Sequence, residues 1–504
     1  MRFDRQILSI GLLIAVLAWT LWFVFAGFGN HQDPLYWLYK YEQMEGGWMA
    51  VGTLLTGGAI VRLFGAQLLP LRLVGWLCTV TAVALPYCCL MDKEQRRTSI
   101  HWLALAFLLM GYGAFQEFSP GTLTVLLLSI LWVLTVKDLD SNCLSVAAAV
   151  VAGVAVAVRF PNILALLILI PLWRKRSLWN IPIVLLSAGI VYLLGWLCIT
   201  PAATDAAMSS HNIGSMLTKL WEKGGLLIGF GLMAVGVLAV GKKGSSLKNP
   251  LPLLLSLLVG LVLVYYIAFV IKPVQWYNID LTYMVSAFCL VLALATGRKE
   301  LYIGAALTVV ASLGTDTAWL KLFPAVLCLL PVAAVQHEAE MRRFLWPALA
   351  VMAIAVAVRF TTNSVGKTNL MEARTSAVVA PYTHIAIRET EQQWLMQVKA
   401  DVDSLGGGLA LGQEMHLMRA VTGCEAGKYN EFWSNIFDSV YTAKYRTVIQ
   451  EQRPVVFCSF SPQFKTKPIY RDGESRLERM LLEEGYQPLD RKRFKYMIYI
   501  PNND

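Results

Sequence analysis

Long apolar segments alternate with short polar clusters along the first 360 residues of the chain. A helix needs about 20 apolar residues to cross a bilayer core, and shorter helices suffice where they are buried or broken. The pattern therefore predicts an α-helical polytopic membrane protein with about thirteen spans. They are expected near residues 7–27, 69–91, 100–116, 121–136, 143–158, 161–173, 179–199, 225–241, 251–271, 281–296, 301–314, 322–335 and 344–360.

Most Lys and Arg residues before residue 345 lie in clusters between these spans. Cytoplasmic loops carry an excess of Lys and Arg, so the clusters orient the chain. Alternation of the spans places the following clusters on one side, which we predict to be cytoplasmic: Arg2/Arg5, Lys93/Arg96/Arg97, Lys137, Arg174/Lys175/Arg176, Lys242/Lys243/Lys248, Arg298/Lys299 and Arg342/Arg343. The outer side then receives 28–68, 200–224, 272–280, 315–317 and everything after Arg359. The first apolar run is expected to be a retained signal anchor, because no small-residue cleavage pattern precedes Asn30.

The chain changes character near residue 361, where apolar runs shrink to strand length and charges become frequent. Candidate strands at 408–412, 454–460 and 496–500 alternate with helical periodicity at 391–404, 434–451 and 474–484. The pattern predicts two parts: a transmembrane domain over 1–360, whose outer loop 28–68 carries interfacial helices, and an extracytoplasmic α/β domain over 361–504. We expect this second domain to have a mostly parallel sheet and to fold alone. The glycine run at 406–408 precedes a strand and is interpreted as a turn.

Composition agrees with the membrane assignment. Of the 504 residues 57% are hydrophobic and 15% charged, and the mean hydropathy is +0.55, which excludes an ordinary soluble globular chain. The net charge of +10 reflects the loop clusters. Nucleic acid is not expected as a partner, because the chain has no basic stripe and no stacking platform.

The nine cysteines show no zinc-ligand spacing, and seven of them lie in or beside apolar runs. No metal site is therefore predicted, although a divalent metal as cofactor stays open. Cys424 and Cys458 lie in the hydrophilic tail, and a disulfide between them is one alternative if the tail faces an oxidising compartment.

The candidate chemistry lies on the outer face, because no catalytic triad order and no Walker loop are present. Asp33 is a lone carboxylate that opens an aromatic-rich loop segment behind the first span. A structural alternative is that Asp33 caps a helix, since Asp favours that position and Pro34 favours the next one. Arg159 lies before Pro161, which interrupts an apolar stretch, so we expect a hairpin with Arg159 pointing outward at its turn. Arg159 alternatively only snorkels to the membrane interface.

Residues 33–41, 59–65 with 71–73, and 158–162 carry a resemblance to a known family. They resemble the acidic loop opening, the end of the interfacial segment and the interrupted hairpin of GT-C membrane glycosyltransferases. The resemblance is to the bacterial branch related to protein mannosyltransferases and aminoarabinose transferases. Many members of that family also end in an extracytoplasmic α/β domain.

The resemblance implies a GT-C-like fold in the bacterial inner membrane and a role in cell-envelope glycan biosynthesis. It implies transfer of a hexose or pentose from a polyprenyl-phosphate donor to a glycan, lipid or protein acceptor. Asp33 would be the general base on the acceptor hydroxyl. The candidates for the donor phosphate are Arg72, Arg159, Lys219 and Lys272, and further substrate contacts are assigned to Tyr36, Glu42 and Asp316.

Structural alternatives accompany these assignments. Glu42 alternatively belongs to a solvated helix face, and Asp316 caps a span. Two other functional classes stay open: a polysaccharide polymerase or flippase, and a non-catalytic relative that binds a lipid-linked glycan or a partner protein.

Overall fold

The structure is a computed structural model that describes residues 2–27, 32–112, 117–137, 142–173, 178–201, 286, 289–290, 292–294, 296–313, 318–336, 374–412, 415–424, 439–459, 477–489 and 496–502. The described part is mostly helical. The predicted spans 225–241, 251–271 and 344–360 lie outside it, as do most of the predicted span 281–296 and the predicted domain boundary near residue 361.

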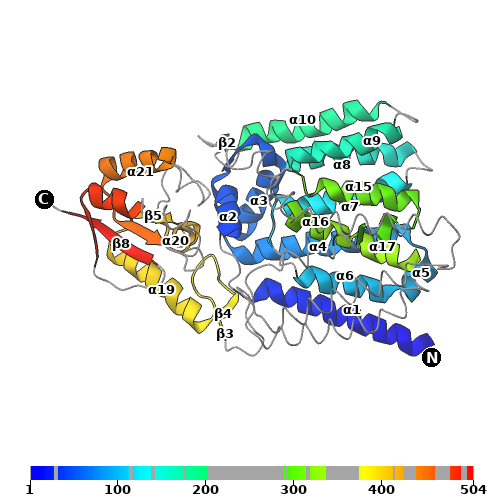
Figure 1. The fold of residues 1–504 in the computed structure, drawn as a ribbon, viewed down its shortest axis with the longest axis horizontal. Coiled ribbons are helices and arrows are strands. Elements are labelled where there is room, and N and C mark those ends of the chain that lie inside the picture. The colour runs from blue at the N-terminus through cyan, green and yellow to red at the C-terminus, as the bar shows by residue number, and fades with distance from the viewer. Residues whose placement is uncertain are drawn as a thin grey trace, which may run out of the picture.

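Every predicted span within the described residues coincides with a helix or a pair of helices (Figure 1). The helices are α1 (Arg2–Phe25), α4 (Leu68–Leu90), α6 (Ile100–Tyr112), α7 (Pro120–Lys137), α8 (Asn142–Val158), α9 (Leu166–Trp173), α10 (Asn180–Cys198), α15 (Lys299–Val310), α16 (Ala318–Leu327) and α17 (Leu329–Gln336). Within the described residues, four stretches are long and apolar enough to cross a membrane: Gln6–Phe25, Leu68–Leu90, Pro120–Lys137 and Asn180–Cys198.

One predicted span, 322–335, forms two helices. Helices α16 and α17 meet at Cys328, where the ladder is interrupted. Pro331 has no N–H to donate to the carbonyl of Leu327, which is four residues earlier, so a continuous helix would lack that hydrogen bond.

Shorter elements connect and cover these helices. Loop 28–68 contains α2 (Gln32–Gln43), a 3₁₀ turn η1 (Trp48–Ala50) and α3 (Val51–Phe64). Helix α5 (Lys93–Thr98) follows α4, and a second 3₁₀ helix, η2 (Phe160–Ala165), joins α8 to α9. The short strand β1 (Glu45–Gly46) pairs in parallel with β2 (Thr200–Pro201), which fixes the end of α10 beside the loop.

The described basic clusters gather at one end of the helices. Helix α5 lies beside the N-terminal end of α1, where Arg97 Nε donates a hydrogen bond to Gln6 Oε1 at 2.7 Å. The indole N–H of Trp132, near the end of α7, donates to the carbonyl of Glu300 at the start of α15 at 2.8 Å. Lys93, Arg96, Arg97, Lys137, Arg298 and Lys299 therefore occupy the end remote from the C-terminal sheet (Figure 1). That this end is cytoplasmic stays a prediction.

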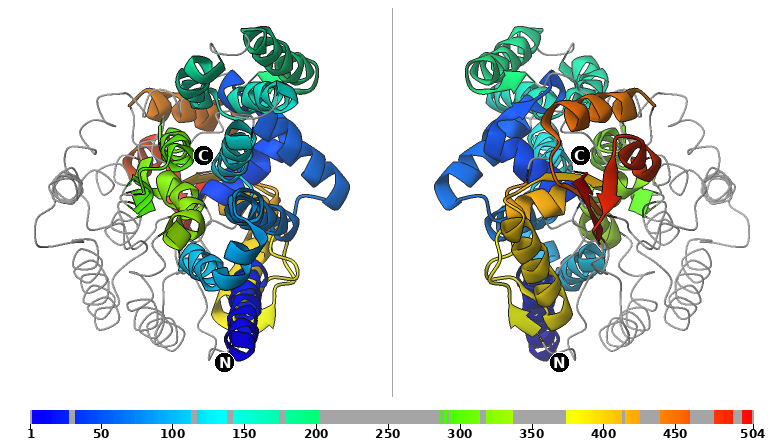
Figure 2. Two further views of the ribbon diagram at one scale, coloured as in Figure 1. Left: turned by 90° about the vertical axis from the view of Figure 1, so that its right-hand side faces the viewer. Right: turned by 90° about the vertical axis from the view of Figure 1, so that its left-hand side faces the viewer.

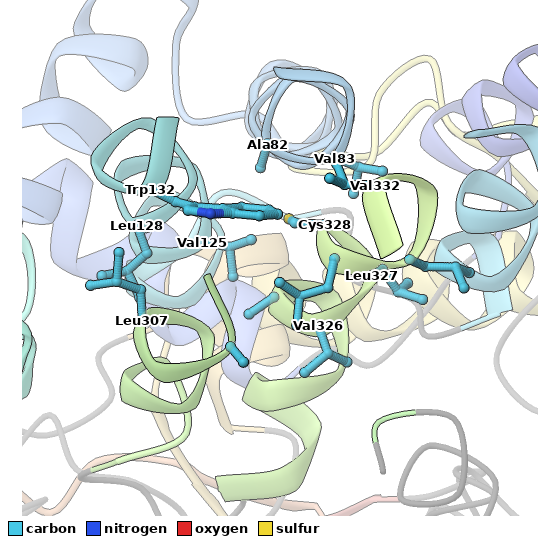
Figure 3. Packing of buried hydrophobic residues seen from close by; sticks show 14 of the residues in the cluster. Ala82, Val83, Val125, Leu128, Trp132, Leu307, Val326, Leu327, Cys328 and Val332 are labelled. Carbon is cyan, nitrogen blue, oxygen red and sulfur yellow. The ribbon is translucent and has the colours of Figure 1, made fainter. Parts of the chain in front are cut away.

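The helical core is apolar and closely packed. Helix α7 lies between α4 and α15, with the Trp132 ring beside Ala82 and Leu128 (Figure 3). Gly304 of α15 permits this approach, because a Cβ there would lie 2.4 Å from the Trp132 ring. Helices α1 and α10 lie at opposite edges of the described helices (Figure 2). The large apolar side chains of α10 are mostly exposed, as expected for a lipid-facing helix.

The C-terminal part combines strands and helices. It contains β3 (Arg374–Ser376), β4 (Ala386–Arg388), α19 (Glu389–Ser404), β5 (Leu409–Gly412), α20 (Met415–Thr422), α21 (Ser439–Gln452), β6 (Val456–Ser459), a helix at 477–483, β7 (Tyr486–Pro488) and β8 (Tyr496–Pro501). The candidate strands and helices predicted from the sequence all correspond to elements of this set. Helix α20 and the short strands β3, β4 and β7 were not predicted.

The predicted mostly parallel sheet is wrong for the described strands. Their order is β5-β6-β8-β7, and only β5 and β6 pair in parallel, whereas β8 is antiparallel to both β6 and β7. Parallel neighbours need a crossover of a dozen or more residues. Residues 489–495 between β7 and β8 are too few, so the chain turns back as a hairpin. The predicted turn at 406–408 is confirmed, with Gly406 and Gly407 at positive φ.

The C-terminal part shares a hydrophobic core with loop 28–68. Leu35 and Leu38 of α2 and Leu68 of α4 belong to the same buried cluster as Tyr382 and Met418. Cys424 and Cys458 are both free thiols in this part of the chain. The expectation that the C-terminal part folds alone stays a prediction, and this shared core means that isolating it uncovers apolar surface.

Candidate functional site

Helix α2 presents an apolar face to the protein and carries the predicted general base near its start. Leu35, Leu38 and Tyr41 are buried at helical spacing, whereas Glu42 is exposed. Asp33 lies in the first turn of the helix rather than at its N-cap, within the one or two residues by which helix ends vary. An acid in a first turn is favoured by the helix dipole. The exposure of Glu42 fits the solvated-face interpretation.

Arg72 reaches the chain segment that leads to Asp33. Its side chain, in the second turn of α4, is only 3% exposed, and its Nη1 donates to the carbonyl of Gly27 at 3.0 Å. Gly27 lies two residues after the end of α1 and has φ +95°, a conformation that favours glycine. Asp33 follows Gly27 by six residues, so Arg72 fixes the position of the backbone shortly before the predicted general base.

Glu117 is a charged residue of this site that the sequence analysis missed. Its Oε1 lies 3.6 Å from Nε of Arg72, and its side chain is 22% exposed. The N–H of the neighbouring Phe118 donates to the carbonyl of Leu71 at 3.0 Å. The carbonyl of Phe118 accepts a hydrogen bond from the Tyr41 hydroxyl at 3.3 Å. These bonds fix the segment between α2 and α4. A usable signal was present, because Glu117 lies between two predicted spans on the Asp33 side.

Arg159 does not point outward, so that expectation is wrong. The predicted interruption at Pro161 is present, since α8 ends at Val158 and η2 begins at Phe160. The Arg159 side chain, however, is buried. Its Nη1 donates to the carbonyl of Ala311 at 2.9 Å and its Nη2 to that of Leu313. The last carbonyls of a helix lack intrahelical donors, and an arginine supplies them at the end of α15.

Tyr36 and Tyr39 turn toward the C-terminal part. The Tyr36 ring meets the His416 ring edge to face, with centroids 5.4 Å apart. The Arg419 guanidinium carbon lies 3.1 Å from the centroid of the Tyr39 ring. The Tyr39 hydroxyl donates to Glu45 Oε2 at 3.3 Å. Burial raises the pKa of Tyr39, against an opposing effect of the Arg419 charge.

The cation of Lys40 also lies in this cluster, with Nζ 5.5 Å from the Tyr36 centroid. Lys40, His416 and Arg419 were not predicted as site residues. The contacts of His416 and Arg419 join positions 380 residues apart, which no local pattern reveals, whereas Lys40 lies four residues from Tyr36 on the same helix.

The structure thus ties Arg72 to Gly27, six residues before Asp33, and places Tyr36 against α20. It does not bring Arg159 to these residues, because the Arg159 guanidinium donates instead to carbonyls at the end of α15. Lys219, Lys272 and Asp316 lie outside the described residues, and nothing is described for the Asp33 side chain itself. Within the described residues, no group of three or more His, Cys, Asp or Glu is placed to hold a metal ion.

No protein-family model matches the chain, and no curated protein matches it. Among solved structures, the chain is similar to ArnT from Cupriavidus metallidurans bound to undecaprenyl phosphate. The identity is 10%, the TM-score is 0.44, and the match covers 98% of this chain and 97% of that one. For the apo state of ArnT the identity is again 10%, the TM-score is 0.45, and the coverage is 99% and 98%. At these values the likeness assigns no activity and no residue role to this chain.

Proposed function

We propose that the chain is a membrane glycosyltransferase that moves a sugar from a polyprenyl-phosphate donor to an acceptor hydroxyl on the outer side of the membrane. The proposal rests on the motif resemblance of residues 33–41, 59–65 with 71–73, and 158–162. The acceptor class, whether glycan, lipid or protein, is left to experiment.

The observation that carries the proposal is the contact of Arg72 with the peptide of Gly27. This contact ties a buried guanidinium to the segment that begins α2 and carries Asp33. Asp33 follows Gly27 by six residues, so the two lie within roughly 20 Å even if the segment were fully extended. A reaction that breaks a sugar–phosphate bond and deprotonates an acceptor requires a cation at the phosphate and a base at the hydroxyl.

Asp33 takes the proton of the acceptor hydroxyl as that oxygen attacks the anomeric carbon of the sugar. The bond from the anomeric carbon to the phosphate oxygen breaks, and polyprenyl phosphate leaves with the electron pair. A single displacement inverts the anomeric configuration. An ionised carboxylate can act in this way only if it touches the hydroxyl in the complex, so geometry matters more than its pKa.

Of the two donor-phosphate candidates that the structure describes, Arg72 and Arg159, the contacts favour Arg72. Its distance to Glu117, 3.6 Å, is longer than a charge-assisted hydrogen bond, which is about 2.7–2.9 Å. A phosphate oxygen that replaces this contact would form a shorter one. The contacts of Arg159 support a structural role instead, because carbonyls of Ala311 and Leu313 occupy two of its nitrogens.

The test uses the full chain in lipid nanodiscs with a panel of radiolabelled polyprenyl-phosphate hexoses and pentoses. A membrane extract supplies acceptors. Asp33→Asn should reduce transfer by about 10²–10⁴-fold, since a positioned base contributes that much. Donor binding should stay normal, because Asn keeps the size and the capping ability of Asp.

The matched control is Asp403→Asn, which changes an exposed carboxylate of α19 and should leave transfer unchanged. Retention of more than about a tenth of wild-type transfer by Asp33→Asn contradicts the base assignment. Donor binding by the wild-type chain without transfer to any acceptor favours the non-catalytic binding class instead.

A further inference from the structure

The C-terminal part contacts the Asp33 segment on both sides of Asp33. Before it, the N–H of Gly27 donates to the carbonyl of Ala386 at 2.8 Å. After it, His416 and Arg419 of α20 contact Tyr36 and Tyr39 of α2. The predicted base therefore lies between two points that the C-terminal part holds.

We propose that α20 positions helix α2 for the reaction, and that His416 and Arg419 are positioning residues that act through Tyr36 and Tyr39. This inference rests on the proposed function for its catalytic consequence, although the contact itself is independent of any activity.

The spacing of the contacting residues supports the proposal. Tyr36 and Tyr39 are three residues apart on α2, and His416 and Arg419 are three residues apart on α20. Residues three apart share a helix face, so the two helices meet through two matched pairs. Two pairs in register restrict rotation of α2 about its axis, which a single pair would not.

Asp33 lies three residues before Tyr36, about one helical turn earlier in α2. A rotation of α2 that breaks the Tyr36 and Tyr39 contacts would therefore move Asp33 around the helix axis. A misplacement of about 1 Å in a reacting group can cost 10²-fold in rate.

The apolar residues beside these contacts are buried. Met415 and Met418 of α20 have no exposed surface, and Leu35 and Leu38 of α2 are buried in the same cluster. His416 is 3% exposed. Removal of the Arg419 contact therefore weakens the packing of α2 against α20 but leaves the apolar contacts between the two helices in place.

The direct test is hydrogen exchange of the α2 amides in the full chain in nanodiscs. Loss of a cation–π contact of this kind lowers local stability enough to raise hydrogen exchange about two- to thirtyfold. Arg419→Ala should therefore raise the exchange of the α2 amides by that factor. Arg419→Lys keeps the charge and should restore much of the protection. Exchange in α19, within the same part of the chain, should stay at the wild-type level.

Arg446→Ala is the matched control. Arg446 pairs with Glu483 and Glu484, away from α2, so its loss should leave α2 exchange and sugar transfer unchanged. If Arg419→Ala fails to fold, Tyr39→Leu replaces it as the test, because it removes the same contact from the other helix. If both single variants fold, the double variant should show no further loss beyond either single one.

In sugar transfer, Arg419→Ala should lower kcat by roughly tenfold to hundredfold with donor affinity unchanged, because only the position of Asp33 is altered. Unchanged α2 exchange in both Arg419→Ala and Tyr39→Leu overturns the proposal, and so does raised exchange with an unchanged kcat. A wild-type chain that transfers no sugar from the panel, while α2 exchange responds as expected, refutes the glycosyltransferase proposal and leaves the docking supported.

Discussion

Substitution of Gly57 in α3 should displace the helix that carries Asp33. A Cβ at this position would lie 2.3 Å from the Tyr41 ring, whereas ordinary contact begins at 3.4 Å, so the ring and the helix must separate by about 1.1 Å (3.4 − 2.3). Tyr41 cannot easily swing away, because its ring stacks on Trp37 at 5.8 Å and its hydroxyl donates to the carbonyl of Phe118.

The expected magnitude combines two opposing effects. Overpacking costs about 1–3 kcal/mol, and replacement of glycine by alanine within a helix gains about 1 kcal/mol. Gly57→Ala should therefore destabilise the protein by about 0–2 kcal/mol and leave it folded. Sugar transfer should fall much further, by about tenfold to hundredfold, since a 1 Å displacement at a reacting group has that effect.

The assay compares kcat for sugar transfer with thermal stability for Gly57→Ala and Gly189→Ala. Gly189 lies in α10, and a Cβ added there would meet no atom within 4 Å. Its replacement should therefore leave kcat unchanged and show only the helix-propensity gain of about 1 kcal/mol in stability. Wild-type transfer by Gly57→Ala would refute the reasoning that the fit of α2 against α3 sets the position of Asp33. A large loss of stability with an equal loss of activity would also refute it.

Three further outcomes are expected. Arg72→Gln should weaken binding of a polyprenyl-phosphate sugar by about tenfold to hundredfold in a filter-binding assay, because a charge-assisted hydrogen bond is worth about 1.5–3 kcal/mol; normal donor affinity would remove Arg72 from the site. A membrane-impermeant maleimide should label a variant that retains only Cys198 in intact cells, and a variant that retains only Cys88 only after permeabilisation. Both thiols are exposed, and they lie at helix ends on opposite sides of the bundle. The reverse labelling pattern would invert the topology. A fragment that begins at Arg374 should bind the dye ANS more strongly than the full chain, because it loses Leu35, Leu38 and Leu68 as core partners; equal dye binding would support independent folding.

The long apolar runs made the described spans predictable, because a run of membrane length has few alternatives to a helix. The division of 322–335 into two helices was missed although Pro331 is visible in the sequence. A proline alone does not predict a break, because Pro86, Pro171 and Pro324 lie inside helices that continue. The mixed sheet was missed for a related reason. Strand β7 has only three residues and ends at Pro488, so the sequence pattern did not predict this strand or its antiparallel pairing with β8.

The site was predictable only where its signal is local. The acid and the aromatic residues of α2 are contiguous in the sequence, and Arg72 was selected because it follows a recognisable segment. Glu117 faces Arg72 from 45 residues away, and α20 is an eight-residue helix whose partner lies near the other end of the chain. Arg159 was interpreted from its neighbours in the sequence, whereas its role is decided by carbonyls about 150 residues later.

The contact between α2 and α20 also imposes an order on the making of the protein. His416 is synthesised 380 residues after Tyr36 (416 − 36), which takes about 20–80 s at 5–20 residues per second. During that interval the apolar face of α2 has no α20 to cover it. The segment that carries Asp33 therefore acquires its final surroundings only as translation ends, and a chain released early would possess nearly all of its spans and still lack a finished site.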